Sequence, residues 1–239
     1  MSEESSKRPR CCLVIGASAS IGPPVLSKMS EAFSTVFATY RRHKPHIKQA
    51  NIKLAKMDIT SSASRDELVG TLVEDVGKIH SVIVLSGIIK GTALSDYSDD
   101  AAQQVMDTNF TGPSLLVRDL LPHIEQNGRI VFVSSIAAER GSFDPVYAAS
   151  KGAIIPFAKS LARAHGYKFS TNVLLPGPIE DSRMVNDMDE AVQSKHRQAS
   201  PSKSFLDTGH FASVLVDLCS PHWIHMNGET IRLNGGSYV

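Results

Sequence analysis

The strongest constraint on the fold is a regular alternation of short apolar runs with longer stretches of helical periodicity. Seven runs have the length and apolarity of buried strands: residues 11–15, 35–40, 52–57, 82–85, 129–134, 170–175 and 229–233. Four longer stretches repeat apolar residues at helical spacing: residues 62–76, 99–126, 146–165 and 207–219. This order predicts right-handed crossovers and an α/β fold, in which a single doubly wound parallel sheet of about seven strands has helices on both faces.

Length and composition narrow the class of protein. A chain of 239 residues fits one α/β domain, which we expect to span residues 11–239 after a polar, flexible segment of residues 1–10. The 25 basic and 24 acidic side chains nearly cancel, so no charge excess predicts a nucleic-acid partner. The chain shows no secretory signal and no apolar run of about 18 residues, which predicts a cytoplasmic protein without a membrane segment.

Cysteine and histidine usage argues against disulfides and against a metal site. The first two of the three cysteines, Cys11, Cys12 and Cys219, are neighbours in an apolar run, which fits a reducing compartment. His222 and His225 are three residues apart, but no cluster of cysteines or carboxylates accompanies them. We therefore expect no metal, and we expect the partner to be a small molecule.

A turn that contains glycine directly follows the first predicted strand. Gly16 and Gly22 enclose this turn, and Pro23 suits the first turn of the helix that follows. Glycine lets backbone N–H groups approach a pyrophosphate at the positive end of a helix, because no Cβ atom blocks the path. The turn therefore predicts a Rossmann-like dinucleotide site, with an ordinary strand-to-helix turn as the alternative.

The end of the second predicted strand bears on which dinucleotide binds. Tyr40, Arg41 and Arg42 lie about twenty residues beyond Gly22, where a dinucleotide-binding unit contacts the adenosine ribose. An acidic residue there would bond the 2′-hydroxyl of NAD, whereas the guanidinium groups of Arg41 and Arg42 suit a 2′-phosphate. NADP is therefore favoured over NAD. The alternative is that both arginines are solvated members of the basic run at residues 41–48.

A tyrosine and a lysine four residues apart predict proton chemistry. Tyr147 and Lys151 share one face of a predicted helix. The phenol has an ordinary pKa of ~10, and an ammonium within about 4 to 6 Å would lower it. Ser135 closes the fifth predicted strand, at the edge where parallel sheets bind ligands, and its hydroxyl can bond a substrate carbonyl. Each feature alone also has an ordinary explanation, as a chance pair on a helix surface and as a turn serine.

Taken together, these features resemble the short-chain dehydrogenase/reductase family over nearly the whole chain, from Leu13 to Gly236. Members carry a glycine-rich turn, an Asp after the third strand, an Asn in the helix before the fifth, a Ser, a Tyr-x-x-x-Lys pair and a Pro-Gly after the sixth strand. Matching residues occur here at each position: Gly16 to Gly22, Asp58, Asn109, Ser135, Tyr147 with Lys151, and Pro176 with Gly177.

The resemblance implies a role for each matching residue. Tyr147 would donate a proton to a carbonyl oxygen as hydride reaches the carbon, while Ser135 orients that oxygen. Lys151 would hold the nicotinamide ribose and lower the Tyr147 pKa, and Asn109 would anchor a proton-relay water. Asp58 would contact the adenine ring. In isolation, Asn109 would be taken for a helix-packing amide and Asp58 for a helix cap.

The residues expected at the cofactor include the glycine-rich turn, the ends of several strands and the catalytic pair. They are Gly16, Ser18, Ser20, Ile21, Gly22, Tyr40, Arg41, Arg42, Asp58, Ile59, Ser86, Gly87, Tyr147, Lys151, Pro176, Gly177 and Ile179. The expected catalytic set is Asn109, Ser135, Tyr147 and Lys151.

Three positions depart from the family pattern. Ser20 stands at the middle glycine of the turn, which narrows the approach to the diphosphate, although its hydroxyl could bond a phosphate. The family's Asn-Asn-Ala-Gly after the fourth strand is here Val-Leu-Ser-Gly, so Ser86 and Gly87 remain to lie against the cofactor. Pro156 removes a hydrogen bond to the Gly152 carbonyl, which predicts a kink just after the catalytic pair.

These expectations combine into an NADP-dependent reductase of a ketone or aldehyde, such as a 3-oxoacyl, polyketide-like or sugar-derived carbonyl. The alternatives are an NAD-linked alcohol dehydrogenase and a catalytically silent protein that senses cofactor or acts as a scaffold. Residues 176–204 are the natural candidate for a mobile lid, and with residues 137–145 and 88–98 they would set specificity. The resemblance also implies a homodimer or homotetramer, in which the helices of residues 99–126 and 146–165 pair between subunits.

Overall fold

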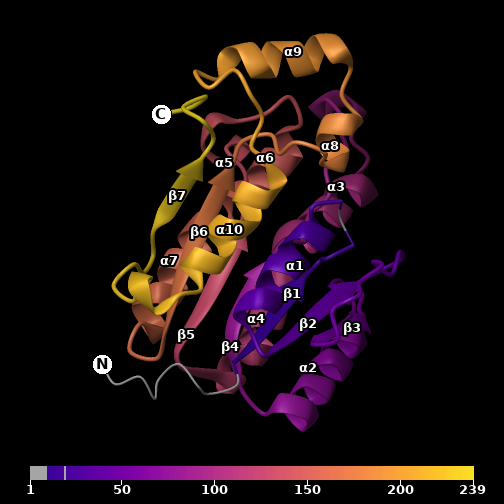
Figure 1. Ribbon diagram of the computed structural model, residues 1–239. Coiled ribbons are helices and arrows are strands. Elements are labelled where there is room, and N and C mark those ends of the chain that lie inside the picture. The colour runs from indigo at the N-terminus through magenta and orange to yellow at the C-terminus, as the bar shows by residue number, and fades with distance from the viewer. Residues whose placement is uncertain (1–9, 19) are drawn as a thin grey trace.

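The chain forms one parallel sheet that is covered by helices on both faces (Figure 1). A computed structural model describes residues 10–18 and 20–239. Neighbouring strands follow the order β3-β2-β1-β4-β5-β6-β7, and all six pairings are parallel. The strands are β1 (Cys11–Ile15), β2 (Thr35–Tyr40), β3 (Ile52–Lys56), β4 (Ile79–Val84), β5 (Ile124–Val133), β6 (Phe169–Pro176) and β7 (Thr230–Leu233). The predicted doubly wound fold is confirmed. The flexible segment predicted at residues 1–10 lies outside the described residues, except for Arg10.

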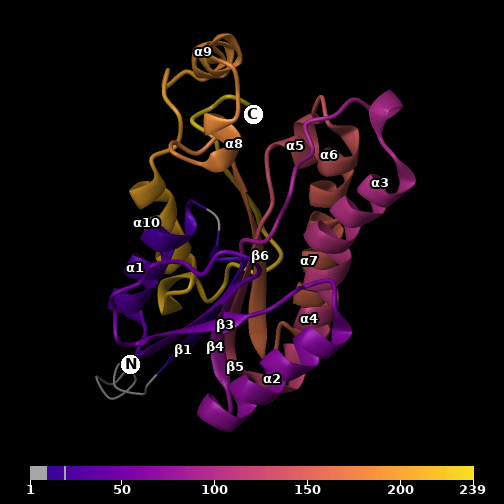
Figure 2. The ribbon, with the colours of Figure 1, turned by 90° about the vertical axis from the view of Figure 1, so that its right-hand side faces the viewer.

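Two helical layers enclose the sheet, and Figure 2 shows them edge-on. The α-helices are α1 (Gly22–Ala32), α2 (Ser62–Val76), α3 (Asp99–Met106), α4 (Gly112–Leu120), α5 (Ala137–Arg140), α6 (Pro145–Gly152), α7 (Ile154–His165), α8 (Arg183–Asn186), α9 (Glu190–Ala199) and α10 (Thr208–Leu218). Helices α1 and α10 pack together on one face, and α2, α4 and α7 cover the other. Short turns η2 (Leu94–Asp96), η3 (Asp107–Thr111), η4 (Leu121–His123) and η5 (Pro221–Trp223) complete the described elements.

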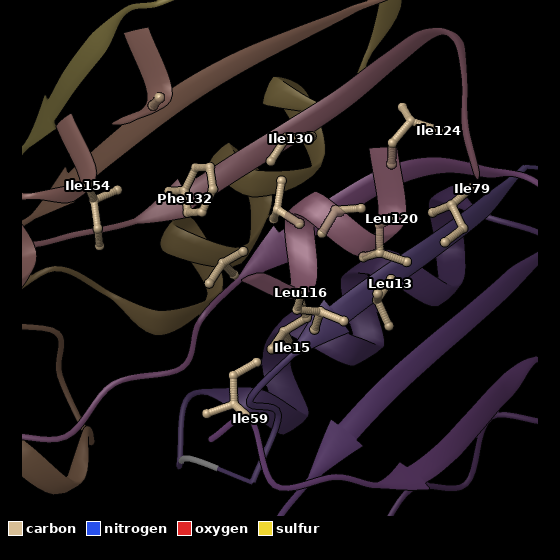
Figure 3. Packing of buried hydrophobic residues seen from close by; sticks show 14 of the residues in the cluster. Leu13, Ile15, Ile59, Ile79, Leu116, Leu120, Ile124, Ile130, Phe132 and Ile154 are labelled. Atoms are coloured by element: carbon tan, nitrogen blue, oxygen red, sulfur yellow. The ribbon is translucent and has the colours of Figure 1, made fainter. Parts of the chain in front are cut away.

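Alternate residues of each strand feed two apolar cores, one under each helical layer. In β1, Leu13 and Ile15 belong to the core beneath α2, α4 and α7, whereas Cys12 and Val14 belong to the core beneath α1 and α10. Figure 3 shows the first core, where Leu116 of α4 lies close to Ile15. Burying one such aliphatic side chain contributes about 1.5–3 kcal/mol. Because both faces are covered, the strands read as continuous apolar runs.

The helix predicted at residues 99–126, which Pro113 and Pro122 were expected to bend or divide, is indeed divided but is wrong at its C-terminal end. The structure divides this stretch into α3, η3, α4 and η4, and β5 then begins at Ile124. Pro122 lies in η4 and cannot continue an α-helical hydrogen-bond pattern. Ile124 instead pairs with Ile79 of β4, and a register shift follows along the two strands. This pairing joins residues far apart in the chain, so the local apolar spacing did not indicate it.

Two other stretches differ from a simple helix or loop. The stretch predicted as one helix at residues 146–165 divides into α6 and α7 at Ala153, as Pro156 indicated. The stretch at residues 176–204, predicted as irregular, contains the short helices α8 and α9. Helix α9 has no buried residue, so it lacks the apolar stripe from which a helix is inferred.

The segments that follow β1, β4, β5 and β6 meet at the carboxyl edge of the sheet, where open parallel sheets bind ligands. No helix in residues 10–18 and 20–239 is both long and apolar enough to cross a bilayer. Within that same part of the chain, the structure holds no group of three or more His, Cys, Asp or Glu side chains arranged to bind a metal ion.

Candidate active site

The buried lysine Lys151 connects α6 to the ends of two strands. Its ammonium Nζ donates hydrogen bonds to the carbonyl oxygens of Val133, at 3.0 Å, and of Ser86, at 3.3 Å. Ser134, at the end of β5, donates from its hydroxyl to the Lys151 carbonyl at 2.8 Å. Burial lowers the pKa of Lys151 from 10.5 to about 8. The ammonium is thus fixed between the segments that follow β4 and β5.

Tyr147 lies one helical turn before Lys151, and its phenol is close enough to the Ser135 hydroxyl for that hydroxyl to affect its pKa. Burial raises the pKa of Tyr147 above its ordinary value of 10, the Ser135 hydroxyl lowers it, and the charge of Asp144 raises it further. The net pKa of Tyr147 is raised because burial is its largest cause, and the Lys151 ammonium is directed to two backbone carbonyls, so its lowering of this pKa stays a prediction. Tyr147 is therefore a protonated phenol at neutral pH.

Asn109 is completely buried in η3, a π-helical turn between α3 and α4. Its Oδ1 accepts a hydrogen bond from the Ile88 N–H at 2.7 Å. Its Nδ2 donates to the Ile88 carbonyl and to the Ser150 hydroxyl of α6, both at 2.9 Å. The side chain therefore clamps the segment after β4 against the catalytic helix, and π-helical turns often occur at functional sites. Its role as an anchor for a water stays a prediction.

Asp144 is a site residue that our sequence analysis did not single out. One carboxylate oxygen accepts hydrogen bonds from the Tyr147 N–H at 2.9 Å and from the Tyr97 hydroxyl at 2.8 Å. The other oxygen accepts from the N–H groups of Lys90, at 3.1 Å, and Gly91, at 3.0 Å. An Asp followed by Pro at the start of a helix is an N-cap signal, which could have identified its first partner. The other three partners lie far away in the sequence.

Two glycines close the turn after β1. Gly16 has a φ of +87°, and a Cβ there would lie 2.7 Å from the Ser86 Cα. At Gly22 a Cβ would lie 1.9 Å from the Ala17 carbonyl oxygen. Only glycine fits either position. The turn after β1 and the segment after β4 thus meet where the strand order reverses, which is the place where doubly wound sheets bind dinucleotides.

Gly87 lets the segment after β4 pass close to the catalytic lysine. A Cβ at Gly87 would lie 2.9 Å from Lys151 Nζ and 3.6 Å from Asn109 Oδ1. The preceding residue, Ser86, has a buried hydroxyl with no hydrogen-bond partner among the described residues. The structure therefore brings Ser86, Gly87, Asn109, Ser135, Tyr147 and Lys151 into one group.

The turn between β1 and α1 also contacts the segment of α8. Ser18 and Ser20 are exposed on this turn, and Ile21 packs against the core beneath α1 and α10. The Ser20 hydroxyl accepts a hydrogen bond from the backbone N–H of Arg183 at 2.9 Å. The departure from the family's glycine pattern thus connects the turn to the first residue of α8.

Arg41 and Asp58 form a second group at the ends of β2 and β3, separate from the catalytic cluster. Arg41 Nε lies 2.9 Å from Asp58 Oδ2. Partial burial raises the pKa of Asp58, but hydrogen bonds from Thr60 and the charge of Arg41 lower it below its ordinary value. Arg42 is exposed beside the pair. The cap of α2 is Ser61, so the reading of Asp58 as a helix cap is wrong.

The other expected cofactor contacts lie along the same edge of the sheet. Tyr40 ends β2, and the buried Ile59 follows β3. Pro176 ends β6, and the N–H of Gly177 donates to a carbonyl at the end of β7 at 2.9 Å. Ile179 is buried and forms an isolated parallel bridge with the segment before α10. The segment that follows β6 is therefore fixed to β7 and to the segment before α10.

Comparison with known proteins identifies the family. A family model described as enoyl-(acyl carrier protein) reductase matches residues 16–238. The chain belongs to the short-chain dehydrogenase/reductase family. It is accordingly an NAD(P)-dependent oxidoreductase, as the catalytic pair and the glycine turn predicted.

Relatives within the short-chain dehydrogenase/reductase family align over almost the entire chain. The 3-oxoacyl-[acyl-carrier-protein] reductase FabG of Vibrio harveyi is 29% identical over 243 residues, which cover 96% of this chain and 98% of that protein. The acetoacetyl-CoA reductase of Acinetobacter sp. is 26% identical over 246 residues, with the same coverage. The crystal structure of a short-chain dehydrogenase/reductase from Brucella melitensis, described as glucose/ribitol dehydrogenase, matches with a TM-score of 0.90 at 25% identity, over 98% of each chain.

The residues of this short-chain dehydrogenase/reductase fit a nicotinamide dinucleotide. Gly16 and Gly22 let the turn pack closely against the backbone of Ser86 and Ala17 at the positive end of α1, where a phosphate is favoured. The buried hydroxyl of Ser86 has no partner among the described residues, which suits a polar ligand beside it. Arg41 and Arg42 place cationic groups at the ribose end of the same edge.

Proposed function

We propose that this short-chain dehydrogenase/reductase reduces a ketone with NADPH. The observation that carries the proposal is the proximity of the Ser135 and Tyr147 hydroxyls at the carboxyl edge of the sheet, with Tyr147 one helical turn from Lys151. Two hydroxyl donors that meet at one point can both bond a single carbonyl oxygen. Such donors stabilise the negative charge that develops on that oxygen during reduction.

The residues of the site divide the proton chemistry between them. Tyr147 gives its proton to the carbonyl oxygen of the substrate, and Ser135 fixes the position of that oxygen. NADPH, when bound, supplies hydride to the carbonyl carbon. The raised pKa of Tyr147 keeps the phenol protonated at neutral pH, which is the state that reduction needs. Lys151 is cationic below about pH 8 and offsets the negative charge left on Tyr147 after proton transfer.

The choice of NADPH rests on the charges at the end of β2. Residues 41–48 contain four lysines and arginines and no acidic residue. Arg41 is held in place by Asp58, and a planar guanidinium held in one orientation suits a phosphate better than a freely rotating one. Arg41 and Arg42 would bind the 2′-phosphate, while Gly16 and Gly22 would admit the diphosphate.

The substrate class that we propose is a 3-oxoacyl thioester. Two relatives are named as reductases of 3-oxoacyl-[acyl-carrier-protein] and of acetoacetyl-CoA. A cavity of about 260 Å³ lies between α9, the start of α10 and residues 234–237, and its lining reaches Ile136 and Gly177 next to the catalytic group. This cavity gives a substrate longer than a simple ketone room on the lid side of the site.

Reduction of a carbon–carbon double bond is the second candidate, because the matching family model carries an enoyl reductase description. The test is NADPH oxidation, followed by absorbance, with a 3-oxoacyl thioester and the 2-enoyl thioester of equal chain length. A polyketide-like ketone, a sugar-derived ketone and an aldehyde complete the panel. We expect turnover of the 3-oxoacyl thioester and a loss of about 10²–10⁴-fold in Tyr147→Phe. Turnover of the enoyl thioester alone would contradict the proposal, and cofactor binding without any turnover would favour the silent alternative.

We also infer that residues 11–239 act as one catalytic domain, which assembles as a homodimer or homotetramer in the cytoplasm. Helices α4 and α7 lie side by side on one face of the sheet and carry half-buried apolar residues such as Leu115, Ile155 and Leu161. These residues support pairing of this face between subunits. The three cysteines are free and buried, which fits a reducing compartment. Light scattering should give a multiple of 25.9 kDa, and the monomer mass would contradict the inference.

A further inference from the structure

We propose that Asp144 is a positioning residue that fixes the loop of residues 88–98 to the catalytic helix and holds a negative charge beside Tyr147. The proposal deepens the proposed function and rests on it. Asp144 is 1% exposed and lies at the N-cap of α6, three residues before the catalytic tyrosine. It has no assigned part in the proton transfer itself, so its effect is exerted through its neighbours.

The carboxylate uses its two oxygens for two different tasks. Oδ1 accepts from the Tyr147 N–H, which caps α6, and from the Tyr97 hydroxyl in the loop. Oδ2 accepts from the consecutive N–H groups of Lys90 and Gly91. Gly91 has a φ of +66°, and this left-handed turn fits the arrangement in which two successive N–H groups reach one oxygen. Hydrogen bonds to a carboxylate are among the stronger ones in proteins.

These contacts exceed what a helix cap requires. A cap needs one oxygen, which Ser, Thr or Asn also provides. The second oxygen of Asp144 binds only the loop, and Asn109 binds the Ile88 end of the same loop through both atoms of its side-chain amide. The loop that starts at the end of β4 is therefore held at two successive points, one by η3 and one by α6. This makes the loop a fixed wall of the catalytic site.

The charge of Asp144 acts on both tyrosines that it contacts. It raises the pKa of Tyr147 and, after burial, the pKa of Tyr97. Lys151 on the same helix is directed to backbone carbonyls. The other charged or titratable groups on helices packed against α6 are Glu139 and Arg140 on α5, Asp99 and Asp100 on α3, Asp107 on η3, and Lys159, Arg163 and His165 on α7, where Lys159 and Arg163 are exposed. Glu139 is paired with Arg232, Asp107 accepts from Gln103, and Asp99, Asp100 and Arg140 are exposed. Asp144 is thus the charged group that directly touches the backbone of Tyr147.

The test compares Asp144→Asn and Asp144→Ser with Tyr97→Phe. Both Asp144 variants keep an oxygen for the cap, so α6 still begins where it does, but they remove the charge and the second acceptor. Tyr97→Phe removes one hydroxyl and leaves the charge and the bonds to Lys90 and Gly91. Amide hydrogen exchange at Lys90 and Gly91 should become about tenfold faster or more in the Asp144 variants and stay near wild type in Tyr97→Phe.

The pH profile supplies a readout that a purely structural cap would not move. Reduction needs protonated Tyr147, so activity falls as pH rises through the pKa of this group. Without the Asp144 charge, the basic limb of kcat/KM should shift to lower pH in Asp144→Asn, and it should not shift downward in Tyr97→Phe. The proposal is overturned if the Asp144 variants have a lower melting temperature but unchanged amide exchange at Lys90 and Gly91 and an unchanged pH profile of kcat/KM. Asp144 would then act only as a helix cap.

The exchange measurement separates this proposal from the proposed function. If the wild-type protein reduces no ketone, the proposed function fails on that result alone. Exchange at Lys90 and Gly91 would still decide whether Asp144 fixes the loop. Ultraviolet absorbance of the phenolate, with Tyr147→Phe subtracted, would still decide whether the charge acts on Tyr147.

Discussion

The catalytic cluster and the lid segment meet at the same edge of the sheet but are held by different interactions. In the cluster, Lys151, Asn109 and Asp144 are at most 4% exposed, and each makes two or more hydrogen bonds. Most of these bonds involve backbone groups of a neighbouring segment. Removing one partner leaves a buried polar group unmatched, which costs about 1–3 kcal/mol. The cluster is therefore rigid, as proton transfer requires.

The predicted lid segment, residues 176–204, is buried at Ile179, Val185 and Ser200, but its ion pairs lie at the surface. Arg183 pairs with Asp187 at 3.2 Å, and Arg197 pairs with Glu180 at 3.0 Å, between side chains that are 38–87% exposed. Exposed ion pairs contribute about 0–1 kcal/mol each. We therefore expect α8 and α9, which lie beyond the carboxyl edge of the sheet (Figure 2), to be held less firmly than the cluster. The cluster and the predicted lid segment are thus held by interactions of different strength.

The largest effect that we predict from the cluster, after loss of Tyr147, comes from Ser135→Ala. This change removes one of the two donors for the carbonyl oxygen, and kcat should fall about 10²–10³-fold, as it does when one oxyanion donor is lost. Steady-state kinetics with the 3-oxoacyl thioester gives the value. Ser213→Ala, at an exposed position of α10, serves as the control and should change kcat little. Equal kcat values for Ser135→Ala and wild type would contradict the role of Ser135 as a donor to the carbonyl oxygen.

Lys151→Met should reveal the energetic cost of the buried ammonium. The folded pKa of about 8 lies below the ordinary 10.5, so the unfolded state binds more protons between these values. Wild-type stability should therefore rise with pH across this window, by about 3 kcal/mol relative to Lys151→Met. Denaturant unfolding at a series of pH values measures the difference. If the free energy of unfolding changed with pH in the same way in both proteins, burial of the ammonium would carry no energetic cost.

Arg41→Ala should weaken NADPH binding by about tenfold or more, because a charge-assisted contact to the 2′-phosphate is lost. NADH binding should change little, since that cofactor has no 2′-phosphate. Calorimetric titration with both cofactors measures the two affinities. Arg183→Ala, which removes an exposed arginine of the lid, is the matched control. Equal losses for NADPH and NADH would remove Arg41 from the cofactor assignment.

Ser20→Ala should give the smallest effect. The change removes the hydrogen bond to the Arg183 N–H, which contributes about 0.5–1.5 kcal/mol and corresponds to roughly 2–10-fold in an equilibrium. Amide exchange in α8 should accelerate by a factor in that range, while exchange in α6 stays unchanged. Ser18→Ala on the same turn should leave α8 unaffected. Faster exchange in both α8 and α6 would mean that the lid segment and the cluster move as one unit, and would contradict the difference in strength inferred between them.

Much of the fold could be predicted because its signals are local. The bounds of β1, β2 and α2 match the predicted residues 11–15, 35–40 and 62–76, since each is delimited by turn residues and a clear apolar pattern. The first half of β5, at residues 124–128, could not be predicted in this way. Its strand conformation depends on pairing with β4, and the local spacing resembles the end of a helix.

The candidate site shows the same division. Gly16 and Ser135 could be identified because they follow predicted strands, and Tyr147 because it lies four residues before Lys151. The structure places Ser135 and Tyr147 close together. The contacts that position the site join distant segments, as in the pairing of Arg41 with Asp58 and the bonds of Asp144 to the loop after β4. Spacing along the chain carries no information about such contacts. It also did not show that burial raises the pKa of Tyr147.

Ser135 and the buried Tyr147 are proposed to serve reduction of a carbonyl group. The most direct test of this proposal is to supply NADPH with deuterium at the reactive nicotinamide carbon, together with a 3-oxoacyl thioester, and to locate the label in the product by mass spectrometry and NMR. We expect one deuterium on the carbon that bears the new hydroxyl, and almost no labelled product with Tyr147→Phe. Label found only in a saturated chain made from the enoyl thioester, or no transfer from bound cofactor to any substrate, would contradict the proposal.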